Sequence, residues 1–134
     1  KLYEISLHTE QELKKLAKEI LKISNSFSNL SKEDIYNYFL NLEDDVSLCK
    51  IEGDSMSGAN ILDGDFVIYQ KTKNVNNNDI IICSINDRMF IKRYVIIEGR
   101  IILRSENPNY LDYAINLDDN FKIIGKVKQL LRNL

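Results

Sequence analysis

The sequence has few of the residue types on which common catalytic and metal sites depend. It contains one histidine, two cysteines and no tryptophan among 134 residues. Zinc ligands usually come in local pairs, and neither Cys49 nor Cys83 has a second ligand nearby, so we expect no metal and no other cofactor. Both cysteines lie in apolar, strand-like runs, which favours small buried residues in a reducing compartment over a disulfide.

The sequence also lacks a strong charge of either sign and any long apolar run. Eighteen Lys and Arg against 20 Asp and Glu give a net charge of −2. This balance argues against a general phosphate-binding surface, so we expect any DNA binding to fall to a part of the protein upstream of Lys1. No apolar run approaches the ~20 residues that cross a bilayer, and the polar N-terminus is not a signal peptide. We therefore expect a cytoplasmic protein without membrane contact.

The composition is that of an ordinary globular protein. Apolar residues make up 44% and charged residues 28% of the chain, which is typical of one domain large enough to bury a core. The chain begins with Lys1 rather than methionine. We therefore expect it to be a piece of a longer protein.

The pattern of apolar residues divides the chain near residue 45. Within residues 1–45, Thr9 and Glu12 fit a capping box. Two apolar stripes then recur at helical spacing: Leu13, Leu16, Ala17, Ile20 and Ile23, then Ile35, Tyr38, Phe39 and Leu42. We predict a helical N-terminal segment or linker with two short helices. We expect no part of it to lie as an extended strand in the site around Ser55 that is described below.

Short β-rich runs separated by turn residues follow in residues 46–134. The predicted strands cover residues 46–51, 65–70, 79–86, 89–97, 100–105 and 121–131. Many short strands without helices between them indicate a compact antiparallel sheet or a barrel-like sandwich. The predicted fold class is therefore mainly β, a compact antiparallel β domain preceded by two short α-helices.

Ser55, in the glycine-flanked stretch GDSM, raises the question of which group would accept its proton. A nucleophilic serine needs a base within hydrogen-bond reach, and the single histidine, His8, lies far upstream. Strand alternation in RMFIKRYVI places Lys92 with Phe90 on one face and Arg93 on the other. Because burial disfavours a lysine ammonium whereas arginine stays charged, a neutral Lys92 is the candidate base. A lysine that reaches solvent from an edge strand fits the same pattern.

Five motifs in one order resemble the LexA/UmuD/phage-repressor family of serine–lysine self-cleaving proteins. They are GDSM at 53–56, DGD at 63–65, IKRY at 91–94, SENPNY at 105–110 and FKIIGKV at 121–127. The resemblance covers roughly residues 46–132. It implies a LexA-like peptidase and dimerisation domain over residues 46–134.

The resemblance assigns roles to the four residues of GDSM and to Lys92. It implies Ser55 as the nucleophile and Lys92 as the general base, in a Ser–Lys dyad. The backbone amides of Asp54 and Ser55 would form the oxyanion hole. Met56 would pack near the nucleophile, and Gly53 would permit a tight approach. Of the other motifs, we expect Asp63 and Asp65 to be structural, and Asn107-Pro108 to form a turn without chemistry.

The sequence departs from the family at the bond that would be cut. The family usually cleaves its own upstream segment at Ala-Gly or Cys-Gly, and no glycine precedes Ser55 by more than two positions here. Three explanations stay open: the bond uses other residues, it lies upstream of Lys1, or the domain is controlled by something other than self-cleavage.

The resemblance implies a C-terminal domain of a bacterial or phage transcriptional repressor that responds to DNA damage. Its partners would be a second copy of the chain and the RecA filament or another inducing protein, with DNA bound through an upstream helix-turn-helix domain. The alternatives are a non-cleaving dimerisation and partner-sensing module, a UmuD-like accessory protein of translesion synthesis, and a signal-peptidase relative.

Overall fold

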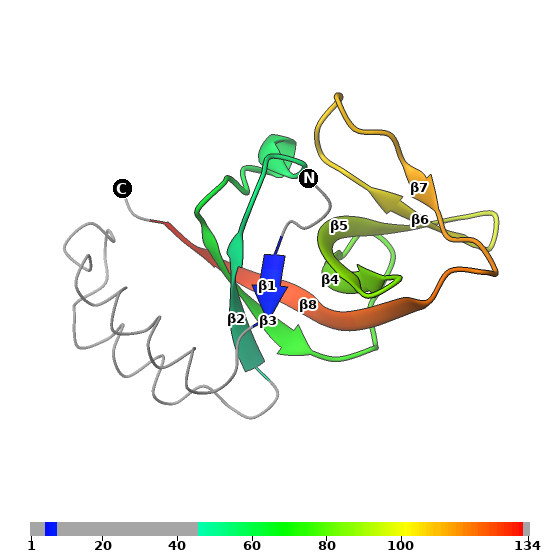
Figure 1. The fold of residues 1–134 in the computed structure, drawn as a ribbon, viewed down its shortest axis with the longest axis horizontal. Helices are drawn as coiled ribbons and strands as arrows, with labels where there is room; N and C mark the ends of the chain where they lie inside the picture. Colours follow the sequence, from blue (N-terminus) through cyan, green and yellow to red (C-terminus); the bar gives the residue numbers. More distant parts are fainter. Residues whose placement is uncertain (1–4, 8–45, 133–134) are drawn as a thin grey trace.

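A computed structural model of the chain describes residues 5–7 and 46–132 (Figure 1). This part forms one antiparallel eight-stranded sheet in the order β1-β2-β3-β8-β4-β5-β6-β7. The strands are β1 (Ile5–Leu7), β2 (Val46–Ile51), β3 (Phe66–Lys71), β4 (Ile80–Ile85), β5 (Arg88–Ile97), β6 (Arg100–Arg104), β7 (Tyr113–Ala114) and β8 (Phe121–Leu131). A short 3-10 helix, η2 (Ser57–Ala59), lies between β2 and β3. Within these residues no helix is long and apolar enough to cross a membrane.

The mainly β prediction for residues 46–132 is confirmed, because all six predicted strands form within one residue of their predicted bounds. The sequence did not predict β1 and β7. Strand β1 lies in the segment predicted to be helical, so that prediction is wrong for Ile5–Leu7, which pair with β2. The two predicted helices lie outside the described residues, and the division of the chain at residue 45 stays a prediction.

Strand β8 joins the two halves of the sheet, since it pairs with β3 on one side and β4 on the other (Figure 1). Gly125 lies where these three strands meet. A Cβ there would fall 2.5 Å from the Gln70 carbonyl oxygen and 2.5 Å from Tyr69 Cδ2. Only glycine therefore lets β8 approach β3 this closely.

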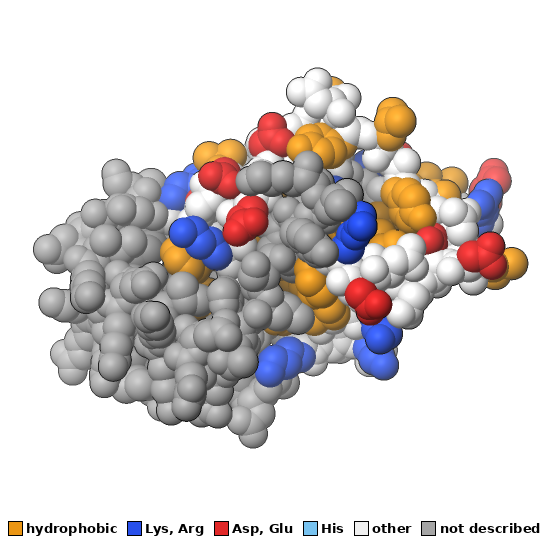
Figure 2. Space-filling view, viewed as in Figure 1, with side chains coloured by type: hydrophobic (Ala, Val, Ile, Leu, Met, Phe, Trp, Pro, Cys, Tyr) orange, Lys and Arg blue, Asp and Glu red, His pale blue; other side chains and the backbone are white. Residues whose placement is uncertain are grey.

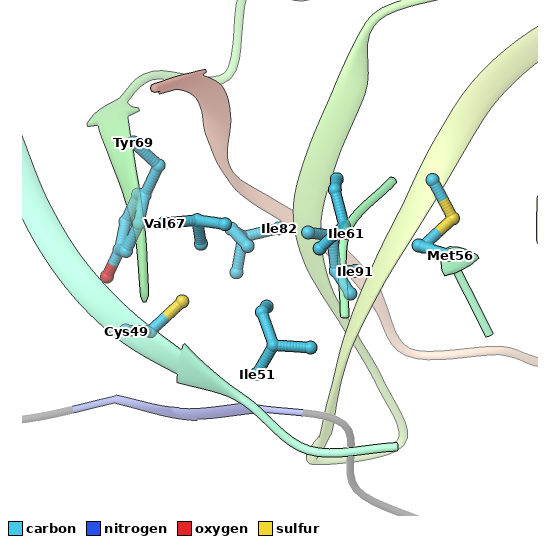
Figure 3. Packing of buried hydrophobic residues seen from close by; sticks show 8 residues of the cluster. All are labelled: Cys49, Ile51, Met56, Ile61, Val67, Tyr69, Ile82 and Ile91. Atoms are coloured by element: carbon cyan, nitrogen blue, oxygen red, sulfur yellow. The ribbon is translucent and has the colours of Figure 1, made fainter. Parts of the chain in front are cut away.

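One apolar cluster fills the space around β2, β3 and the chain that follows β2. It consists of Cys49, Ile51, Met56, Ile61, Val67, Tyr69, Ile82 and Ile91. Figure 3 shows Cys49 beside Val67 and Tyr69, with Met56 at the far end of the cluster. Cys49 and Cys83 are both buried, as the sequence predicted for these two residues. Burial raises the pKa of the Cys49 thiol to about 12.

Strand β5 contributes its two faces to two different clusters. Ile91 belongs to the cluster just described. Tyr94 and Phe90 belong to a second one, with Ile81, Cys83 and Leu103. Phe90 and Tyr94 thus lie on the face opposite Ile91, and Lys92 lies over the Phe90 ring, which confirms the predicted alternation along β5.

The surface carries charges of both signs. On the face seen in Figure 2, Lys and Arg side chains of the described residues lie among Asp and Glu side chains, and neither sign forms a large area. This mixture agrees with the small net charge of −2.

Candidate active site

Ser55 lies in the turn that leads from β2 into η2, and its side chain is buried, with 3% of the residue exposed. The turn is closed by backbone hydrogen bonds. The Ser57 amide donates to the Asp54 carbonyl oxygen at 3.1 Å, and the Ala59 amide donates to the Met56 carbonyl oxygen at 3.0 Å. Met56 is 1% exposed and anchors the turn in the first apolar cluster. The turn is thus fixed both by its own hydrogen bonds and by core packing.

Gly53 supplies the unusual backbone conformation at the start of this turn. Its φ is +92°, a region that residues with a Cβ rarely adopt. A Cβ at this position would meet nothing within 4 Å, so within the described residues it is the backbone conformation that favours glycine, and a close approach to Gly53 stays a prediction. The Gly53 amide donates to Asp63 Oδ1 at 2.8 Å, which ties the GDSM turn to the DGD turn.

Asp65 also has a structural set of contacts. Its carboxylate accepts from the Leu62 amide at 2.7 Å and from Arg132, with Nε 2.8 Å from Oδ1 and Nη2 2.7 Å from Oδ2. The same Arg132 Nη2 donates to the Asn60 carbonyl oxygen at 2.6 Å. This ion pair links the residues after β8 to the loop after η2. The contacts of Asp63 and Asp65 are of the structural kind that the sequence predicted.

Lys92 lies on β5, half-buried between polar and aromatic groups. Its Nζ donates to the Ser105 hydroxyl oxygen at 2.7 Å. The same nitrogen lies 5.7 Å from the centre of the Phe90 ring and 5.5 Å from that of Tyr110, within the range of a cation–π contact. Ser105 is itself buried, with 9% exposed. The lysine amine is therefore held in one place by a short hydrogen bond and by two rings.

Arg93, the neighbour of Lys92, points away from this environment. Its guanidinium forms an ion pair with Glu106 and donates to the Asn78 carbonyl oxygen at 2.6 Å. Side-chain exposures of 27% and 30% for Arg93 and Glu106 place the pair near solvent. Of the two basic residues in IKRY, only Lys92 lies against aromatic rings and a buried hydroxyl.

The 105–110 segment, which follows β6, contacts both the Ser55 turn and Lys92. The Gly58 amide donates to the Glu106 carbonyl oxygen at 2.6 Å. The Asn107 side-chain amide donates to the Asp54 carbonyl oxygen at 2.9 Å. The Tyr110 hydroxyl donates to Asp54 Oδ1 at 2.6 Å, and the Tyr110 ring lies over Lys92. The structure thus brings the Ser55 turn and Lys92 against one short segment.

Three of these contacts could not be expected from the motif SENPNY, in which Asn107-Pro108 predicts only a turn. They belong to Ser105, Asn107 and Tyr110. A signal for Ser105 was present, because only Glu98 and Gly99 separate the strands predicted at 89–97 and 100–105, which became β5 and β6. With Ile97 opposite Arg100 and Arg93 opposite Arg104, Ser105 follows directly opposite Lys92. No comparable pattern pointed to Asn107, whose partner is 53 positions away in the chain.

Comparison with known proteins gives the chain a family and a set of relatives. Residues 15–128 match the Peptidase S24-like family. The LexA repressor of Clostridium novyi (strain NT) is 36% identical over 103 residues, which are 75% of this chain and 50% of that protein. The LexA repressors of Paracidovorax citrulli (strain AAC00-1) and Providencia rettgeri are 36% and 33% identical, over 64% of this chain in each case. The chain spans between 38% and 50% of the length of these three relatives.

Proposed function

The chain belongs to the Peptidase S24-like family, and on that premise we propose that it is the Ser–Lys self-cleavage and dimerisation domain of a transcriptional repressor that responds to DNA damage. The relatives named LexA repressor support the repressor assignment. The observation that carries the chemistry is that the 105–110 segment contacts both the Ser55 turn and Lys92.

In the proposed reaction, Ser55 Oγ attacks the carbonyl carbon of a peptide bond while the neutral Lys92 amine takes the hydroxyl proton. The negative charge that develops on the carbonyl oxygen is stabilised by the backbone amides of Asp54 and Ser55. The intermediate then collapses, the C–N bond breaks, and the Lys92 ammonium returns its proton to the departing amine. Water hydrolyses the resulting ester with Lys92 again acting as the base, which regenerates the Ser55 hydroxyl.

The surroundings of Lys92 suit a base with a fixed direction. A neutral amine has one lone pair, which must face the hydroxyl that gives up its proton. The bond from Lys92 Nζ to Ser105 Oγ, at 2.7 Å, engages one N–H of that amine. The rings of Phe90 and Tyr110 limit where the rest of the amine can turn. We therefore assign Ser105 the role of orienting Lys92.

The remaining activities are those of a longer protein, because the chain spans about half the length of its relatives or less. We propose that DNA is bound by an upstream domain, that the repressor acts as a homodimer in the cytoplasm, and that the RecA filament or another inducing protein triggers cleavage. A non-cleaving dimerisation and sensing module is the second candidate. The absence of an Ala-Gly or Cys-Gly bond upstream of Ser55 in this sequence favours it.

Incubation of the full-length protein across pH 7 to about 10.5 tests the proposal. An ordinary lysine amine is almost fully protonated at neutral pH, so a reaction that needs the neutral amine accelerates as the pH rises. Intact-mass spectrometry should show two fragments that sum to the parent plus one water. Ser55→Ala and Lys92→Ala should each abolish them. A protein that stays whole over the entire series, or that is still cut in Ser55→Ala, would overturn the self-cleavage assignment.

A further inference from the structure

We infer that Asn107 is a positioning residue for the oxyanion hole, through its hold on the peptide group between Asp54 and Ser55. This inference rests on the proposed function, because it takes Ser55 as the nucleophile and the Ser55 amide as a donor to the oxyanion. It assigns a role to a side chain whose motif, Asn107-Pro108, predicts only a turn.

A single peptide group connects Asn107 to the proposed oxyanion hole. The Asn107 Nδ2 donates to the Asp54 carbonyl oxygen at 2.9 Å. That carbonyl and the Ser55 N–H belong to the same planar peptide, and no peptide bond among the described residues is cis. In a trans peptide the C=O and the N–H point in opposite directions. A side chain that fixes the direction of the Asp54 carbonyl therefore fixes the direction of the Ser55 N–H.

Both the oxygen and the nitrogen of the Asn107 side-chain amide form hydrogen bonds. Its Oδ1 accepts from the Asn109 backbone amide at 2.9 Å, so the Nδ2 end is directed at the Ser55 turn. The same Nδ2 lies 3.3 Å from Ser57 Oγ. The bond from the Gly58 amide to the Glu106 carbonyl oxygen, at 2.6 Å, holds the two backbones together next to it. The amide of Asn107 is thus placed before any substrate arrives.

The direction of the Ser55 N–H should affect the rate of the proposed reaction. An oxyanion donor accelerates a reaction because it already points where the charge develops and does not have to turn during the reaction. The Asp54 carbonyl accepts from the Ser57 amide at 3.1 Å as well as from Asn107. Without Asn107 the Asp54 carbonyl oxygen would lose the shorter of these two bonds and keep the longer one from the Ser57 amide. Loss of a complete oxyanion donor lowers kcat about 10²–10³-fold, so a donor that only loses its fixed direction should lower it about tenfold or more.

Asn107→Asp separates positioning from turn formation. A carboxylate still accepts from the Asn109 amide, which preserves the local turn, but it cannot donate to the Asp54 carbonyl. Asn86→Asp is a matched control in the β4–β5 turn. Asn86 Oδ1 also accepts from a backbone amide, that of Asn120 at 2.9 Å, and its Nδ2 also donates, to Asp119 at 3.3 Å. Both substitutions keep one acceptor and remove one donor.

Two measurements decide the matter. The first is the Ser55-dependent self-cleavage rate of the full-length protein at alkaline pH. We expect it to fall about tenfold or more in Asn107→Asp and to stay within about twofold in Asn86→Asp. The second is the residual dipolar coupling of the Ser55 N–H in this chain at neutral pH, which reports the direction of that bond. We expect it to change in Asn107→Asp while the couplings of β4 and β8 do not.

The outcomes distinguish this inference from the proposed function. A wild-type protein that makes no Ser55-dependent fragments refutes the self-cleavage, and with it the catalytic role of Asn107. If the wild type cleaves, either of two results overturns the inference alone. One is a wild-type rate in Asn107→Asp, and the other is an unchanged Ser55 coupling. If cleavage slows and the coupling changes together, the positioning role is supported.

Discussion

Gly58 is the position at which one added methyl group should separate the Ser55 turn from the 105–110 segment. A Cβ on Gly58 would lie 2.4 Å from the Glu106 carbonyl oxygen and 3.1 Å from its carbonyl carbon. The first distance must grow to at least about 3.0 Å, because real Cβ atoms do not come closer. Both atoms met by the methyl group belong to the backbone, so no side chain can swing aside. The two segments themselves have to move apart in Gly58→Ala.

The cost follows from the contacts at this point. Overpacking of this kind costs about 1–3 kcal/mol, while the stiffer unfolded chain returns about 0.4–1 kcal/mol. The net loss of unfolding free energy is roughly 1–2 kcal/mol. In a domain of this size each kcal/mol lowers Tm by about 4–8 °C. The same movement stretches the bonds that flank Glu106, from Lys92 to Ser105 and from Asn107 to Asp54. We therefore expect cleavage to fall further than the loss of stability explains.

Gly99→Ala is the matched control for this substitution. Gly99 lies in the β5–β6 turn with a φ of +76°, and a Cβ there would meet nothing within 4 Å. Alanine in that conformation costs about 1–2 kcal/mol through backbone strain, but it moves nothing in the candidate site. Urea unfolding followed by far-UV circular dichroism gives the stabilities, and self-cleavage is measured at the same interval below each Tm. Equal cleavage rates in the two variants, or an unchanged stability in Gly58→Ala, would refute the reasoning.

Three further predictions concern the core, the sheet and the assembly. Burial raises the pKa of the Cys49 thiol from 9.0 to about 12. Between pH 9 and pH 12 the thiol therefore loses its proton in the unfolded chain but not in the folded one. The free energy of unfolding should then fall by about 1.4 kcal/mol per pH unit as the pH rises above 9. The difference in unfolding free energy between the wild type and Cys49→Val should follow that slope, whereas parallel pH curves would contradict it. Gly125→Ala should lower Tm and leave the chain harder to refold, because its Cβ would meet the Gln70 backbone and the Tyr69 ring at 2.5 Å; an unchanged melting curve would show that β3 and β8 can separate freely. The protein should form a homodimer to which residues 121–131 contribute, and a monomeric mass by light scattering at tens of micromolar would remove that part of the proposal.

The sheet was predictable where local residues carry the information. Strands β2 to β6 and β8 are bounded by turn residues, and a two-residue turn such as Glu98-Gly99 fixes the register of the strands it joins. From that register the opposition of Lys92 and Ser105 can be counted. Strand β1 could not be found in this way, because three residues show no period and their partner, β2, lies far along the chain. Strand β7 has only two residues, which is too short to show the alternation of a strand.

The proposed catalytic residues could be predicted from the sequence, but the residues that hold them in place could not. Ser55 and Lys92 are singled out by residue type, by the alternation along β5 and by the resemblance of their motifs. Asn107 could not be singled out, because Asn-Pro is also a common turn sequence. Its contact with Asp54 depends on how two loops meet in space. Long-range polar contacts of this kind leave no periodic pattern, so they emerge only when the chain is folded.

The position of the 105–110 segment beside the sheet explains why its hydrogen bonds should affect the cleavage rate more than the stability of the fold. The Ser55 turn joins β2 to β3, and Lys92 lies on β5, so the two belong to the parts of the sheet on either side of β8 (Figure 1). The 105–110 segment follows β6 on the Lys92 side and makes its hydrogen bonds with the Ser55 turn. We expect the apolar clusters to keep most of their contacts if those bonds were lost, since no residue of the segment is among their members. The position of Ser55 relative to Lys92 should depend on those hydrogen bonds and should change when they are lost. Substitutions in the 105–110 segment should therefore change the cleavage rate at nearly constant Tm, whereas substitutions in the clusters should change Tm first.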